Sequence, residues 1–247
     1  MIDIGKELAV QSYCFRHFKD IPTLLAKVGE SGMTRIELCF AHVKPDQPDT
    51  LDAILAAHRN AGVKIVSYGV HTLGVNGDAD RAAAAFCQAA GAKHMNVDFK
   101  PDSFDQAAPA AEKLAEEFGL KLMIHNHGGR HWLGGAQMLE YVFSRTSDRI
   151  GLCLDTAWAM HSHEDPIKMV ERFGSRLYGL HLKDFTFARD GGFTDAIVGT
   201  GNLDLPALRN ALKAVGFSGV AVLEFEGSVE NPVPEVRQCV ENIRKHL

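Results

Sequence analysis

The segment GLKLMIHNHGGRH, residues 119–131, joins the end of a helix-like stretch to an apolar run that carries three histidines. Glycine commonly takes the left-handed conformation that ends a helix, and the apolar run after Gly119 has the length and alternation of a β-strand. Successive side chains of a strand point to opposite faces, so Met123, His125 and His127 are expected on one face. The segment therefore predicts a helix–glycine–strand unit ending in two histidines, which are either hydrogen-bonded buried residues or ligands.

The same unit recurs along the chain. Six strand-like runs follow the glycines Gly32, Gly62, Gly91, Gly119, Gly174 and Gly216, and two more lack such a glycine. The eight expected strands are 8–15, 33–40, 63–70, 92–99, 120–127, 149–156, 176–185 and 217–226. Helix starts are marked by an acid or amide close before a proline, at Asp20, Asp165, Asp204 and Asn231. Strict alternation of strands and helices predicts an α/β fold with parallel strands. Eight units favour a single (β/α)8 barrel over residues 1–247, rather than an open doubly wound sheet.

Composition and charge restrict the class of partner. The net charge is −5 with the twelve histidines counted as neutral, and there is no run of Lys or Arg. This argues against a protein that follows nucleic-acid phosphates, which needs a basic face. No apolar stretch reaches the ~20 residues of a membrane span, and the N-terminus lacks the pattern of a signal peptide. The five cysteines are scattered without a CxxC pair, so a reduced, cytoplasmic protein is expected.

Polar residues at the strand ends form the candidate site, because such barrels carry their active sites at the carboxyl ends of the strands. Asp155, His181 and Glu224 end the sixth, seventh and eighth expected strands at one height, directed into the barrel mouth. Together with an imidazole from the fifth strand, they form a mixed nitrogen and oxygen set for one divalent ion, such as Mn, Co, Zn, Fe or Mg. Without a metal, the two carboxylates need cationic partners, which Lys183 and the histidines could supply.

Other strand-end residues are candidates for substrate contact. Glu37 is either a substrate contact or the partner of an arginine such as Arg35 or Arg130. His71 follows the third strand, and Trp158 is either a platform for a sugar ring or a packing residue over the mouth. The loop 198–208, VGTGNLDLPAL, is either a plain turn before a capped helix or a site whose backbone N–H groups hold an anion.

The order of the motifs HNH (125–127), LDT (154–156), HLKD (181–184), GTGNLD (199–204) and LEFE (223–226) resembles the xylose isomerase-like TIM barrels over nearly the whole chain. This family is often named sugar phosphate isomerase/epimerase. The resemblance implies metal ligands from a strand-5 acid, a strand-6 Asp, a strand-7 His and a strand-8 Glu, and Asp155, His181 and Glu224 match the last three. The chain has His125-Asn126-His127 where isomerase members have a glutamate. HNH-containing members are more similar to inosose dehydratases and keto-sugar lyases.

The resemblance implies a divalent-metal-dependent isomerase or epimerase of a sugar or keto-sugar. An ion held by His127, Asp155, His181 and Glu224 would chelate a carbonyl and an adjacent hydroxyl and stabilise an enediolate. The candidate acid/base residues are Glu224, His125, His131 and Lys183.

Three alternatives stay open: a metal-dependent lyase or dehydratase of keto-sugars or inososes, a metallonuclease similar to endonuclease IV, and a non-catalytic sugar-binding barrel. The expected partner is a small sugar or keto-sugar, with no nucleic acid and no membrane. The sequence is also compatible with a homo-oligomer.

Overall fold

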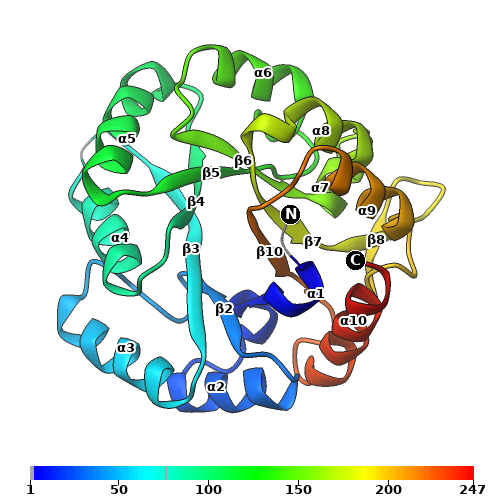
Figure 1. Ribbon diagram of the computed structural model, residues 1–247, viewed down its shortest axis with the longest axis horizontal. Helices are drawn as coiled ribbons and strands as arrows, with labels where there is room; N and C mark the ends of the chain where they lie inside the picture. The colour runs from blue at the N-terminus through cyan, green and yellow to red at the C-terminus, as the bar shows by residue number, and fades with distance from the viewer. Residues whose placement is uncertain (1–2, 76) are drawn as a thin grey trace.

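The computed structural model describes residues 3–75 and 77–247 and shows eight parallel strands closed into a barrel, with helices around it (Figure 1). The strand order around the barrel is β1-β10-β7-β6-β5-β4-β3-β2. The barrel strands are β1 (Ala9–Gln11), β2 (Arg35–Leu38), β3 (Lys64–Leu73), β4 (His94–Phe99), β5 (Lys121–His125), β6 (Ile150–Asp155), β7 (Leu177–Leu182) and β10 (Val220–Leu223). The single (β/α)8 barrel predicted from the alternation of elements is confirmed.

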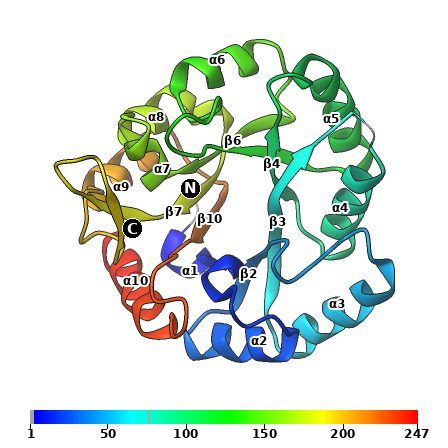
Figure 2. The ribbon, with the colours of Figure 1, turned by 180° about the vertical axis from the view of Figure 1, so that it is seen from behind.

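The helices form the outer layer, which is visible from both ends of the barrel (Figures 1 and 2). They are α1 (Ile4–Glu7), α2 (Ile21–Glu30), α3 (Leu51–Asn60), α4 (Asp78–Ala89), α5 (Phe104–Phe118), α6 (Ala136–Ser144), α7 (Thr156–His161), α8 (Pro166–Phe173), α9 (Leu205–Ala214) and α10 (Val233–His246). The longest of them, α5, buries Phe104, Ala107, Ala108, Ala111, Leu114 and Ala115. This spacing of three and four residues places one apolar stripe against the strands. No helix among the described residues is long and apolar enough to cross a membrane.

The predicted helix ends are mostly confirmed. The carboxylates of Asp20, Asp165 and Asp204 accept backbone N–H bonds in the first turns of α2, α8 and α9. Asn231 makes no such cap, because α10 begins at Val233 and its N-cap residue is Pro232. Five of the six predicted glycines have positive φ, as at Gly119, where φ is 65°. The prediction for Gly174 is wrong: its φ is −49°, and a Cβ there would lie 2.6 Å from the Val215 side chain.

The expected strand 176–185 divides into two parts. β7 stays in the barrel, while β8 (Asp184–Phe187) turns outward and pairs antiparallel with β9 (Phe193–Ala196) in a separate hairpin. The carboxylate of Asp184, at the start of β8, accepts four backbone N–H bonds of 2.9–3.0 Å from residues 199–203. The glycine-rich loop therefore does surround an anion, but that anion is a carboxylate of the same chain. Asp204 caps α9 immediately afterwards, as the simpler interpretation predicted.

The barrel interior below the strand ends is closely packed. Met123 of β5 and Cys153 of β6 are fully buried there. Gly179 of β7 faces both, and a Cβ at this position would lie 2.8 Å from the Met123 sulfur. Glycine is required because the sulfur atoms occupy the space that a side chain would need. This packed layer lies directly below the candidate site and closes the barrel beneath it.

Candidate metal centre

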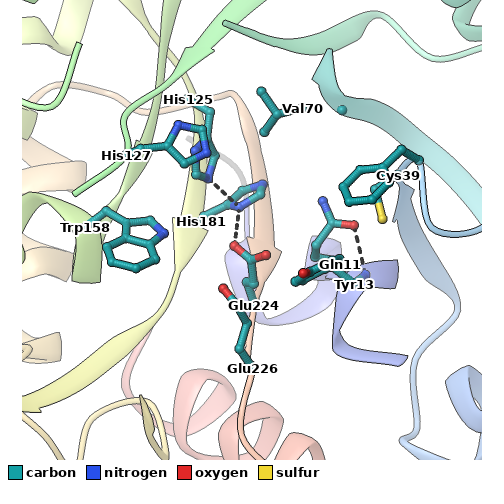
Figure 3. A pocket seen from close by; sticks show the side chains of 12 residues that line it. Gln11, Tyr13, Cys39, Val70, His125, His127, Trp158, His181, Glu224 and Glu226 are labelled. Carbon is teal, nitrogen blue, oxygen red and sulfur yellow. Dashed lines mark hydrogen bonds and ion pairs between the residues drawn. The ribbon is translucent and has the colours of Figure 1, made fainter. Parts of the chain in front are cut away.

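A pocket of about 260 Å³ opens at the carboxyl ends of the strands (Figure 3). It is lined by Gln11, Tyr13, Cys39, Phe40, Gly69, Val70, His125, His127, Trp158, His181, Glu224 and Glu226. Trp158 and His127 lie on one side of His181 and Glu224, and Gln11 and Tyr13 lie on the other (Figure 3). A pocket of this size, with an aromatic wall and convergent polar groups, suits a small polar ligand.

Four buried side chains meet at the floor of this pocket. His125, Asp155, His181 and Glu224 each present one ligand atom, and these atoms all lie within 4.8 Å of one another. The Nδ1 atom of His181 is 3.0 Å from Glu224 Oε2 and 3.0 Å from His125 Nε2, while His125 Nε2 is 3.6 Å from Asp155 Oδ2. Strand register explains the meeting, because Asp155 pairs with His181 and His181 with Val222, two residues before Glu224. The structure thus brings Asp155, His181 and Glu224 together as predicted from their strands.

The donor atoms of this group fit a divalent cation. Asp155 Oδ2 is buried and has no hydrogen-bond partner among the described residues, although its other oxygen accepts the Trp158 N–H at 2.8 Å. A buried carboxylate oxygen without a partner is costly, and a cation would remove that cost. Two imidazole nitrogens and two carboxylates are a donor set that zinc, manganese and cobalt accept.

The orientation of His181 also suits a ligand. Its Nε2 lies 2.8 Å from Glu37 Oε1, so a neutral ring that donates its N–H there presents the Nδ1 lone pair to the group. Metal-binding histidines commonly donate their second nitrogen to a carboxylate in this way. Burial lowers the pKa of His181, but the adjacent Cys153 and Glu37 together raise it well above its ordinary value. A proton on Nδ1 therefore takes the ligand position when no cation is bound.

The other three members have shifted pKa values. Burial raises the pKa of Asp155 to about 6, although Lys183 opposes this shift. Burial and the neighbouring His181 lower the pKa of His125 to about 3. Burial also penalises the charge of Glu224, but Lys183 and His181 outweigh it and hold its pKa well below the usual range. Near neutral pH the group therefore contains the neutral His125 ring and two carboxylates, which are ready to bind a cation, while His181 must release its Nδ1 proton to join them.

Glu37 lies below the pocket and is fully buried. Besides His181, it accepts hydrogen bonds from Gln11 Nε2 at 2.6 Å, Asn96 Nδ2 at 2.7 Å and the Ser67 hydroxyl. The sequence predicts Glu37 as a substrate contact or an arginine partner, but the structure places it neither in the pocket lining nor beside an arginine among the described residues. Its geometry is that of a positioning residue which holds the His181 ring.

Neither arginine considered for Glu37 is its ion-pair partner. Arg35 pairs with Glu7 at 2.8 Å, and Arg130 forms no ion pair with any described residue. His71, expected at the substrate, contacts Asp80 at 2.7 Å and lies outside the pocket lining.

The two histidines at the end of the fifth expected strand, His125 and His127, belong to different side-chain groups. β5 ends at His125, so His127 lies beyond the barrel and lines the pocket wall. His127 belongs to a second group with Asp98 and His131, in which His131 Nε2 is 3.2 Å from Asp98 Oδ2. In this geometry His125, and not His127, joins Asp155, His181 and Glu224, and His131 does not line the pocket.

Trp158 lines the pocket on the same side as His127, and the buried Lys183 lies against its ring. Lys183 is 1% exposed, its ammonium contacts Glu226, and it lies 4.9 Å from the centre of the Trp158 ring. Trp158 lines the pocket and packs against Phe185 and Phe193. It is therefore both a packing residue and a surface that a ligand can touch.

Sequence reasoning assigned no role to several lining residues. Glu226 is the clearest, because its spacing of two from Glu224 already placed it on the inward face of the last strand. Gln11 could have been found in the same way, because it is the last residue of the first strand. Tyr13 and Phe40 come from the segments after β1 and β2, where alternation no longer applies.

The fold and the site define a (β/α)8 barrel with histidines and carboxylates gathered at the carboxyl ends of its strands. The chain belongs to the xylose isomerase-like TIM barrel family, which matches residues 25–246. Its family assignment from sequence motifs is thereby confirmed.

Among curated relatives, the rhizopine catabolism protein MocC of Rhizobium meliloti is 31% identical over 130 residues, which are 47% of this chain and 39% of MocC. An inosose dehydratase of Lacticaseibacillus casei is 24% identical over 147 residues, 52% of this chain and 49% of that enzyme. The chain thus spans half or less of the length of these relatives. The IolI protein, whose crystal structure holds a zinc atom, matches with a TM-score of 0.78 and 16% identity over 98% of this chain and 99% of IolI. This last likeness shows the shared fold.

Proposed function

We propose that this chain is a divalent-metal-dependent enzyme that removes a proton next to the carbonyl of a small keto-sugar or cyclic keto-polyol. The observation that carries the proposal is the buried group of His125, Asp155, His181 and Glu224 at the pocket floor, where Asp155 Oδ2 has no hydrogen-bond partner among the described residues. These four residues would hold the cation. When bound, a divalent cation supplies positive charge that stabilises the enediolate oxygens formed on proton removal.

Glu226 is the residue we assign to proton transfer. It lines the pocket beside the four-residue group, and its carboxylate contacts the buried ammonium of Lys183. Burial raises the pKa of Glu226, although Lys183 opposes the shift, and a raised pKa suits a carboxylate that accepts protons near neutral pH. Lys183 holds the Glu226 side chain in place and offsets its charge. The sequence predicts His125 and His131 as acid/base residues instead, but His125 belongs to the four-residue group and His131 contacts Asp98.

A single carboxylate on one wall restricts the reaction outcome. Glu226 can remove the proton and return it to the departing β-hydroxyl, so that a C–H and a C–O bond break, a C=C bond forms and water leaves. It can equally return the proton to the former carbonyl carbon while the hydroxyl on the first carbon gives its proton to the former carbonyl oxygen. The carbonyl and the hydroxyl then exchange carbons, which is an isomerisation. Epimerisation needs a second donor on the opposite face. We favour dehydration, because the similarity to an inosose dehydratase supports it, and isomerisation is the second candidate.

The test uses chelator-treated protein reloaded with Zn²⁺, Mn²⁺ or Co²⁺ in D₂O, with inososes and 3-keto-sugars as substrates. Proton NMR measures exchange at the carbon next to the ketone, and ultraviolet absorbance detects the conjugated product of dehydration. We expect metal-dependent exchange that falls at least ~100-fold in Glu226→Gln, while Glu241→Gln, an exposed change on α10, keeps the wild-type rate. Absence of exchange with every metal and ketone would refute the proposal. Exchange without the ultraviolet signal would identify the isomerase instead.

A further inference from the structure

The group of Asp98, His127 and His131 lies next to the four-residue group but has no part in the proposed reaction. Each of the three residues offers one ligand atom, and these atoms lie within 4.8 Å of one another. We propose that they form a second, weaker site for a divalent cation of the zinc, cobalt or manganese type. Two imidazoles and one carboxylate are a known set for such ions, with open positions left for water or substrate oxygens.

The distances suit a shared ion. His131 Nε2 lies 3.2 Å from Asp98 Oδ2, and the rings of His127 and His131 are 5.0 Å apart. Two ligands held at ~2.0–2.1 Å from a tetrahedral zinc ion are about 3.3 Å from each other. The Asp98–His131 separation therefore needs little change to accept an ion between these two atoms.

The charges around the group also favour a cation. Asp98 forms no ion pair with Lys or Arg in the part of the chain that the structure describes; its partner is His131. Its second oxygen accepts the Phe99 N–H at 2.8 Å, which fixes the carboxylate.

One hydrogen bond must change for the ion to bind. The Leu133 N–H donates to His131 Nδ1 at 3.3 Å, so a neutral His131 carries its proton on Nε2, facing Asp98. A cation takes the Nε2 lone pair, so the ring proton moves to Nδ1 and the Leu133 bond is lost. That bond is long, and losing it costs about 1 kcal/mol or less. The need to displace it is the reason we expect the second site to be weaker than the first.

The position of the group indicates what the ion would contact. The His127 ring lines the pocket and is 4.6 Å from the ring of His125, a member of the first group. An ion at the second site therefore borders the same pocket. Its open positions would accept a hydroxyl or carboxylate oxygen of the ligand that the first group holds.

The test counts metal ions, not turnover. Chelator-treated protein is dialysed against increasing Zn²⁺ at pH 7.5, and bound zinc is measured by mass spectrometry and by calorimetric titration. We expect two equivalents for the wild type, with a tight and a weaker step. Asp98→Asn and His131→Ala should lose the weaker step, with its affinity at least ~100-fold lower, and keep the tight step unchanged. This loss exceeds the ~10–100-fold typical of changes outside the ligand shell.

Controls separate this proposal from the first. His17→Ala removes another histidine that pairs with a carboxylate, Glu230 at 3.0 Å, and should retain both equivalents. Glu224→Gln should lose the tight step alone. One equivalent in the wild type, or two equivalents that survive Asp98→Asn, would overturn the second site. A tight step that survives Glu224→Gln would contradict the first group while leaving the result for Asp98 and His131 readable.

Discussion

Asp155→Asn should make the metal-free protein more stable while removing its main metal site. Asp155 is fully buried, and one of its oxygens accepts the Trp158 N–H while the other has no partner in the described chain. Asparagine has nearly the same shape, and its oxygen can keep the bond to Trp158. The substitution therefore removes a buried negative charge and little else.

The magnitude follows from the Asp155 pKa. Burial raises this pKa from 3.8 to about 6 in the folded protein, and such a rise corresponds to about 3 kcal/mol of folding free energy. This value already contains the attraction of Lys183 for the charge. Between about pH 4 and pH 6 the folded chain holds a proton that the unfolded chain has released, so stability falls as pH rises. Above pH 6 the full cost is present.

The asparagine variant lacks this cost. Metal-free Asp155→Asn should exceed the wild type by up to about 3 kcal/mol at pH 8, and the difference should shrink to near zero at pH 4. Urea unfolding at several pH values, in the presence of a chelator, measures it. With Zn²⁺ at 100 times its dissociation constant, the wild type should gain about 2.7 kcal/mol and the variant nothing from this site.

The matched control is Asp165→Asn, the same change at an exposed residue that caps α8. It should alter stability little at any pH. The reasoning is refuted if metal-free Asp155→Asn is less stable than the wild type at pH 8, or if their difference does not vary between pH 4 and pH 6.

Three further predictions concern the surroundings of the site. Glu37→Gln should weaken zinc binding ~10–100-fold, because it loosens the hold on the His181 ring; calorimetry that finds an unchanged affinity would exclude this role. Trp158→Ala should raise KM for the ketone several-fold with unchanged zinc stoichiometry, and Trp158→Phe should restore most of the loss; equal KM values in all three proteins would mean that the ring does not touch substrate. Gly151→Ala should cost about 1–3 kcal/mol in urea unfolding, since its Cβ would meet the Arg176 carbonyl and the Tyr178 ring; wild-type stability would show that the strands can separate at this point.

The barrel could be predicted because its signals are local and repeated. Each strand and each helix has its own period of apolar residues in the sequence. The order of these elements is then compatible with only a few topologies. The convergence of Asp155, His181 and Glu224 could also be predicted, because alternation and strand order determine which residues share a height.

The choice between the strand-5 histidines could not be predicted in this way. Alternation places His125 and His127 on one face, but the strand ends at His125, and where a strand ends depends on its neighbours. The partners of Glu37 come from four other strands, so nothing near Glu37 in the sequence indicates them. The outward turn after β7 depends on Asp184 meeting a loop fifteen and more residues away.

The four backbone hydrogen bonds to Asp184 determine where the sequence of this protein can be altered without disturbing the barrel. They fasten the start of the β8–β9 hairpin to the loop 199–203, which leads directly into α9. Residues 188–192 at the hairpin tip lie outside this attachment and are mostly exposed. Insertions or exchanges at the tip are therefore expected to leave the barrel undisturbed. The hairpin also carries Phe185 and Phe193, which pack on Trp158, so it is the segment through which the pocket entrance can be remodelled without altering the metal ligands.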